Sequence, residues 1–147
     1  MVRLLKFWSS TRREKLLLCE AVILLLLSGL CIKIIPFKRI YSFLQRRYGH
    51  VKIDDYEPCN WAGDTIERTV SRAANGLLGK NLCLTQSIAA FIMLRRRGIP
   101  AVVLTGVKVL KNSSLSAHAW VNTGEEASKQ LSTNSDFTVV LKIGRAV

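Results

Sequence analysis

The feature that most narrows the fold is an abrupt change from helical to strand patterning after Gly98. Upstream, apolar residues recur at helical spacing between Asn81 and Arg97, and Gly98 and Pro100 end this helix. Downstream, three apolar, β-branched segments separated by loops have the pattern of strands: Ala101–Val109, Ala117–Asn122 and Phe137–Ile143. A helix followed by three strands predicts an α+β fold with a small antiparallel sheet.

The segment Leu16–Ile35 is the most apolar part of the chain. Its uncharged centre, Ala21–Ile32, is shorter than the roughly 20 apolar residues of a membrane-spanning helix, and Glu20 and Lys33 flank it closely. No small-residue cleavage pattern follows, as a secretory signal would require. We interpret the segment as a helix that packs on this chain or on a protein partner, with membrane contact as the less favoured alternative.

Two more helices are expected before Asn81. Phe37–Tyr48 is basic, with apolar residues on one side, and a helix capped by Asp64 or Thr65 carries apolar residues at helical spacing as far as Leu77. The charged stretch between these helices, from Gly49 to Cys59, is typical of a linker.

The chain therefore divides into two predicted regions. Residues 1–49 form an N-terminal helical region that contacts a partner or a membrane, and residues 50–147 form the core. With 147 residues, the chain can bury a core without metal or disulfide staples. The four cysteines are scattered, with no CxxC pair, so we expect no zinc site, no other metal and no cofactor. Unpaired thiols favour a reducing compartment, the cytoplasm.

Positive charge is in large excess, with 22 Lys and Arg against 10 Asp and Glu, a formal net charge of +12. Such an excess attracts nucleic acid, anionic lipid or acidic peptides without specifying which. The basic runs, such as Arg95-Arg96-Arg97, are not interleaved with aromatic residues, and no helix-turn-helix or zinc-finger spacing occurs. We therefore expect no nucleic-acid partner and interpret the runs as solvated helix faces.

Cys83 lies at the start of the helix expected between Asn81 and Arg97. In the first turn of a helix, unpaired backbone N–H groups and the helix dipole favour negative charge. A thiolate, the nucleophilic form of cysteine, is stabilised there, and the same N–H groups can donate to an oxyanion when a carbonyl is attacked. A buried structural cysteine is the alternative, because a thiol packs like a small apolar group.

His118 is one of two histidines and lies on a predicted strand, 35 residues after Cys83. Because successive side chains of a strand point to opposite faces, His118 and Trp120 lie on one face. Ala117 and Ala119 lie on the other. These small neighbours leave room for a helix end to approach. A cysteine at a helix start facing a histidine on a strand is the recurrent geometry of cysteine peptidases and transglutaminases. A merely packed histidine is the alternative, but the pair together favours catalysis.

A third residue should hold the imidazole in its working tautomer. Asp136 is the first candidate, because it enters the last strand, which we expect to pair with the strand that carries His118. Glu125 and Glu126 lie in the intervening turn, and Gln130 could orient the ring through its carbonyl oxygen. These three residues remain alternatives.

Three motifs follow one another in a specific order: CLTQS at residues 83–87, LRRRGIPA at residues 94–101 and AHAWV at residues 117–121. Upstream, Glu20-Ala21 within the Leu-rich helix and Pro36-Phe37-Lys38-Arg39 belong to the same pattern. In this order, spread over nearly the whole chain, the motifs resemble the leader peptidase of lasso-peptide biosynthesis, a transglutaminase-like protease.

The resemblance implies a papain- or transglutaminase-like core with a Cys–His–Asp site, which here would be Cys83, His118 and Asp136. The substrate would be a ribosomally made precursor peptide, whose leader is removed before an ATP-dependent lasso cyclase closes the core peptide into a ring. Family members this short are usually the split form, in which a separate leader-binding protein presents the precursor. The family's acid often follows the histidine more closely than Asp136 does, at a place where this chain has Gln130.

Two other functions stay open at this point. The first is acyl transfer to an amine, as in transglutaminases, by the same cysteine and histidine. The second is a non-catalytic, membrane-associated scaffold protein that uses the Leu16–Ile35 helix and the basic surface.

Overall fold

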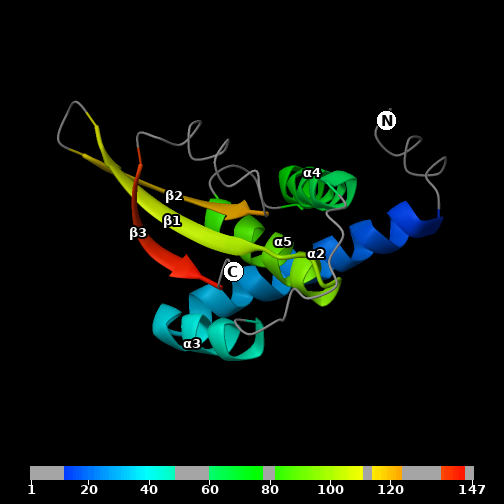
Figure 1. The fold of residues 1–147 in the computed structure, drawn as a ribbon, viewed down its shortest axis with the longest axis horizontal. Helices are drawn as coiled ribbons and strands as arrows, with labels where there is room; N and C mark the ends of the chain where they lie inside the picture. Colours follow the sequence, from blue (N-terminus) through cyan, green and yellow to red (C-terminus); the bar gives the residue numbers. More distant parts are fainter. Residues whose placement is uncertain (1–11, 49–59, 78–81, 111–113, 124–136, 145–147) are drawn as a thin grey trace.

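The computed structural model describes residues 12–48, 60–77, 82–110, 114–123 and 137–144. Helices come first and strands last, as Figure 1 shows. The described elements are α2 (Arg12–Ile34), α3 (Phe37–Tyr48), α4 (Asn60–Leu77), α5 (Cys83–Arg96), β1 (Val102–Val109), β2 (Leu115–Asn122) and β3 (Thr138–Ile143). The predicted α+β class is confirmed.

The three strands form one antiparallel sheet in the order β2-β1-β3. Val103 of β1 lies opposite Val121 of β2, and Gly106 lies opposite His118. On the other side of β1, β3 pairs with an irregularity between Thr105 and Gly106. The last strand therefore pairs with β1, and our expectation that it pairs with the strand that carries His118 is wrong.

Helix α5 lies at the centre of the molecule, between the sheet on one side and α2 and α4 on the other (Figure 1). It is buried along most of its length because apolar or small residues face all its neighbours. The main core joins α5 to both α2 and the sheet, and its largest fully buried side chains are Phe91, Leu25, Leu44, Met93, Leu94, Ile143, Val70 and Val103.

Two helix starts differ from the sequence-based expectation. α2 begins at Arg12, four residues before the apolar segment, because the preceding basic residues continue the same helix. α4 begins at Asn60, so the prediction that Asp64 or Thr65 caps this helix is wrong. Asp64 lies one turn inside α4, where its carboxylate is 3.6 Å from the guanidinium of Arg68, a pair four residues apart.

In the basic run at the end of α5, Arg96 and Arg97 are exposed, as the sequence suggested, but Arg95 is not on a solvated face. Arg95 is only 3% exposed, and its Nε donates a hydrogen bond to the carbonyl oxygen of Ala101 at 3.1 Å. Burial lowers the pKa of this guanidinium from its ordinary value. Arg96 and Arg97 pair with the carboxylate of Glu20 on α2, and Arg96 Nη1 lies 3.2 Å from Glu20 Oε1. The run therefore fastens α5 to β1 and to α2.

The N-terminal helices belong to the same core as the sheet. Ala21 and Leu25 of α2, and Leu44 of α3, are buried against α5 and its neighbours. The predicted boundary between residues 1–49 and 50–147 falls in a stretch outside the described residues, so the division remains a prediction.

Replacing Phe91 with alanine is expected to reduce the free energy of unfolding by about 3–5 kcal/mol, because a fully buried ring leaves a cavity. The ring also packs edge-on against Tyr48, with centroids 6.1 Å apart. Urea denaturation followed by circular dichroism measures the change. Phe43, which is 63% exposed, supplies the matched control, and Phe43→Ala should change stability by less than about 0.5 kcal/mol. Equal effects of the two variants would contradict the proposed core.

Candidate active site

Cys83 is the first residue of α5, and its thiol is free and partly exposed. Leu82 precedes it and makes no side-chain capping hydrogen bond, while its carbonyl oxygen accepts the first helical hydrogen bond, from the Gln86 N–H at 2.9 Å. The side chain at the N-cap position therefore leaves the first backbone N–H groups of α5 uncapped. Such groups can stabilise a thiolate or a developing oxyanion beside Cys83.

His118 lies in the middle of β2, and its imidazole is packed between two aromatic rings. It stacks on Trp120, with centroids 5.8 Å apart and an interplanar angle of 19°, and it lies 5.7 Å from the ring of Phe137. Trp120 and Phe137 also pack with Val102 and Leu104 in a small cluster of their own. The prediction that His118 and Trp120 share one face of the strand is confirmed.

This aromatic cluster covers the face of the sheet opposite to α5. Val103 and Val121, which alternate with the cluster residues along β1 and β2, belong to the core that contains α5. Because successive side chains of a strand point to opposite faces, the imidazole of His118 lies on the side away from α5. The small residue Ala119, by contrast, is on the α5 side, so α5 packs on the alanine face of β2.

α5 packs against β2, the strand that carries His118. α5 is about 20 Å long at 1.5 Å per residue, and a short turn joins its end to β1, which runs back along it. About six residues of β1 at roughly 3.3 Å each cover the same distance, so the start of α5 lies towards the end of β1, whose second half pairs with the first half of β2.

The structure thus brings the helix of Cys83 and the strand of His118 together, with the ring on the far face of that strand. β2 is an edge strand of the three-stranded sheet. Contact between thiol and imidazole requires the ring to leave Trp120 and the backbone of β2 to turn His118 towards the α5 face. The assignment of Cys83 and His118 as a catalytic pair stays a prediction.

The candidates for the third residue all lie outside the described residues. They are Asp136, Glu125, Glu126 and Gln130. The nearest described neighbour of Asp136 is Phe137, whose ring contacts the imidazole of His118. The ring of Phe137, directly before β3, therefore lies on the His118 face of the sheet, although β3 itself pairs with β1.

Gly106 allows the aromatic rings to approach the sheet, and sequence reasoning missed this role. A Cβ atom there would lie 2.9 Å from Phe137 Cβ and 3.1 Å from Trp120 Cη2. The available signal was a glycine inside an otherwise β-branched strand, which often marks a close approach. Gly106 thereby fixes where Trp120 and Phe137 hold the imidazole.

Within the described part of the chain, two buried polar atoms on β2 have no hydrogen-bond partner: Trp120 Nε1 and Asn122 Oδ1. The first is a donor and the second an acceptor, and both residues lie on the same face as His118. Both atoms are shielded from solvent, where an unpaired polar group costs about 1–3 kcal/mol. Among the residues that the structure describes, no cluster of His, Cys, Asp and Glu could hold a metal ion.

Replacing Gly106 with alanine is expected to destabilise the protein by about 1–3 kcal/mol, because Phe137 and Trp120 must give way to the added methyl group. Chemical denaturation measures the loss. Gly76→Ala is the matched control: a Cβ at this position in α4 meets nothing within 4 Å, so alanine should be neutral or stabilising. A Gly106→Ala variant as stable as the wild type would show that the rings do not depend on this contact.

A family model described as Transglutaminase-like superfamily matches residues 37–142, which is more than half of the chain. The match begins at the first residue of α3 and ends within β3, and it includes Cys83 and His118. Neither the search of curated proteins nor the search of solved structures gave a match.

Proposed function

Because the chain belongs to the transglutaminase-like superfamily, we propose that it is a cysteine peptidase that removes the leader from a ribosomally made precursor peptide in lasso-peptide maturation. The family is compatible with both peptidase and acyl-transfer activity through a cysteine. The finer assignment rests on the motifs around Cys83, Arg95 and His118 that resemble lasso-peptide leader peptidases.

The observation that carries the proposal is the position of Cys83 as the first residue of α5, inside the segment that matches the family. A thiol there has uncapped backbone N–H groups beside it and an exposed side, which a nucleophile needs. α5 also packs on β2, the strand that carries His118, which supports the choice of this residue as the base. A buried structural cysteine needs none of these features.

In the proposed reaction, His118 accepts the thiol proton and the Cys83 thiolate attacks the carbonyl carbon that joins leader to core. The N–H groups at the start of α5 donate to the oxyanion. When the C–N bond breaks, His118 gives its proton to the leaving amine of the core, and the leader remains on Cys83 as a thioester. Water then attacks the thioester, which releases the leader as a carboxylic acid and restores the thiol.

In this proposal the precursor is presented in the cytoplasm by a separate leader-binding protein, and the freed core peptide passes to a lasso cyclase.

The test is incubation of the full-length protein with a candidate precursor peptide, with and without the leader-binding protein, followed by mass spectrometry. We expect two fragments whose masses add up to the precursor plus one water, and faster cleavage when the leader-binding protein is present. A precursor that stays intact in both conditions contradicts the proposal.

The same experiment addresses acyl transfer, which the family description favours as a second function. The two reactions share the thioester and differ in whether water or an amine resolves it. Adding a primary amine should leave the hydrolysis products unchanged if the protein is a peptidase. A product that gains the amine and loses ammonia or the leaving peptide would identify a transferase instead.

A further inference from the structure

Helix α2 has an apolar face that the rest of the described chain does not cover. Six of its large side chains are at least half exposed: Leu16 (70%), Ile23 (56%), Leu26 (50%), Leu27 (52%), Leu30 (56%) and Ile34 (70%). At 100° per residue they fall on one side of the helix, opposite the buried Ala21, Leu25 and Ser28. The stripe is about 27 Å long at 1.5 Å per residue. A stripe of this size needs an apolar partner.

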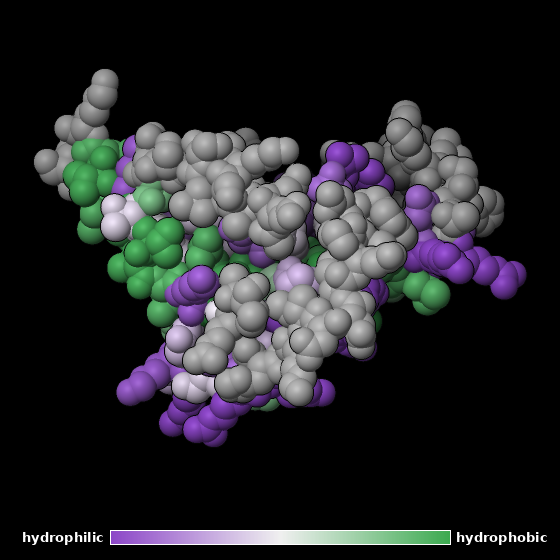
Figure 2. All heavy atoms as spheres, in the orientation of Figure 1, coloured by the Kyte–Doolittle hydropathy of each residue, from purple (hydrophilic) through white to green (hydrophobic). Residues whose placement is uncertain are grey.

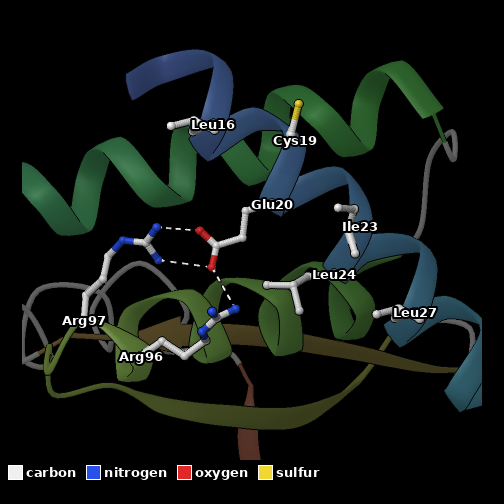
Figure 3. A pocket seen from close by; sticks show the side chains of 8 residues that line it. All are labelled: Leu16, Cys19, Glu20, Ile23, Leu24, Leu27, Arg96 and Arg97. Atoms are coloured by element: carbon white, nitrogen blue, oxygen red, sulfur yellow. Dashed lines mark hydrogen bonds and ion pairs between the residues drawn. The ribbon is translucent and has the colours of Figure 1, made fainter. Parts of the chain in front are cut away.

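The other side of α2 is fastened to the folded domain. Ala21 and Leu25 are part of the main core, and the Glu20 carboxylate binds the guanidinium groups of Arg96 and Arg97 on α5 (Figure 3). Length and composition alone would allow α2 to cross a bilayer. If α2 crossed a bilayer, the surfaces of α4 and α5 that it covers would be exposed, and the ion pairs of Glu20 with Arg96 and Arg97 would break. α2 therefore suits contact along its length with an apolar surface, with its buried side still on the domain.

Basic residues at both ends of α2 and on α3 favour a partner surface with negative charge. Arg12 and Arg13 begin α2 and Lys33 lies in its last turn. α3, which begins three residues after α2 ends, has no acidic residue, and its exposed side carries an aromatic ring, Phe43, among basic residues. Those exposed basic residues are Lys38, Arg39, Arg46 and Arg47. Figure 2 shows hydrophilic side chains gathered over α3 and near the start of α2.

We propose that α2 and α3 form a docking surface for an anionic lipid bilayer, on which the protein binds peripherally. The α2 stripe enters the boundary between headgroups and acyl chains, and the exposed basic residues of α3 contact headgroup phosphates. A second copy of the chain is a poorer partner, because it would bring two sets of these basic residues together without compensating acids. The proposal is independent of the peptidase proposal, since it uses neither Cys83 nor His118.

The test is co-sedimentation of the full-length protein with lipid vesicles, in the absence of any precursor peptide. We expect binding to vesicles of phosphatidylcholine in which about a third of the lipid is phosphatidylglycerol, and much weaker binding to phosphatidylcholine alone. Binding should weaken as salt screens the basic residues. Alkaline carbonate should release the bound protein, because a peripheral helix does not span the bilayer.

Two pairs of substitutions test the two parts of the surface separately. Leu27→Gln with Leu30→Gln should weaken binding at least about tenfold, through loss of apolar burial. Arg39→Gln with Arg46→Gln should weaken it about fivefold per residue at low salt.

Each pair has a matched control on an exposed part of the domain outside α2 and α3. Leu115→Gln with Val140→Gln, and Arg72→Gln with Lys142→Gln, should leave binding unchanged, because these residues are exposed on β2, β3 and α4. Circular dichroism confirms that every variant is folded. The proposal is overturned if the wild type does not bind anionic vesicles, which would point to a protein partner, if the controls lose as much binding, or if carbonate fails to release the protein.

Discussion

Replacing Cys83 with alanine is expected to abolish cleavage of the precursor, with a loss of at least about 10⁴-fold in turnover, while the protein stays folded. The reason is that no other group in the proposed reaction can form the thioester with the leader. The side chain is partly exposed at the start of α5, so its removal leaves no large cavity. Mass spectrometry of the precursor and a thermal melt of the variant give the two measurements.

Cys31 provides the matched control for this substitution. It is also a free, partly exposed cysteine, but it lies near the end of α2. Cys31→Ala should cleave the precursor at the wild-type rate. If Cys83→Ala retained full activity, or if both alanine variants lost it equally, Cys83 would not be the nucleophile and the peptidase proposal would fail.

The sequence predicted the elements well where the local pattern was strong. Phe37–Tyr48 is the helix α3 with the same bounds, and the expected strand Phe137–Ile143 differs from β3 by one residue. The stop signals at Gly98 and Pro100 end α5 as predicted, and Gly98 takes the positive φ of 74° that suits a glycine after a helix. These features depend on neighbours along the chain, which a sequence displays directly.

The remaining features depend on contacts between residues far apart in the sequence. Nothing local in Arg95 distinguishes it from Arg96, yet one is buried against Ala101 and the other pairs with Glu20 on α2. The strand order is not visible in the sequence either, because the pattern of β3 does not distinguish pairing with β1 from pairing with β2.

In the candidate site, one feature follows from the local sequence and another depends on contacts between distant residues. Alternation along β2 correctly predicted that His118 and Trp120 share a face. It could not tell which face lies against α5, because that choice is made by the packing of Val103 and Val121 against the helix. The sequence therefore indicated which residues share a face of β2, but not the side of the sheet on which the imidazole lies.

Two substitutions of His118 separate its proposed chemistry from its packing. His118→Ala should lower turnover by about 10²–10⁴-fold, because no group then accepts the thiol proton or protonates the leaving amine. It should also cost about 1 kcal/mol of stability, since the imidazole stacks on Trp120 and contacts Phe137. His118→Phe replaces the imidazole with a ring that can keep both contacts but cannot transfer a proton.

We therefore expect His118→Phe to be as inactive as His118→Ala and nearly as stable as the wild type. Turnover is followed by mass spectrometry and stability by urea denaturation. If His118→Phe restored cleavage along with stability, the imidazole would serve only to complete the aromatic cluster over Gly106. Loss of cleavage in both variants, with stability lost only in His118→Ala, would instead show that turnover needs the imidazole for more than its packing in the cluster.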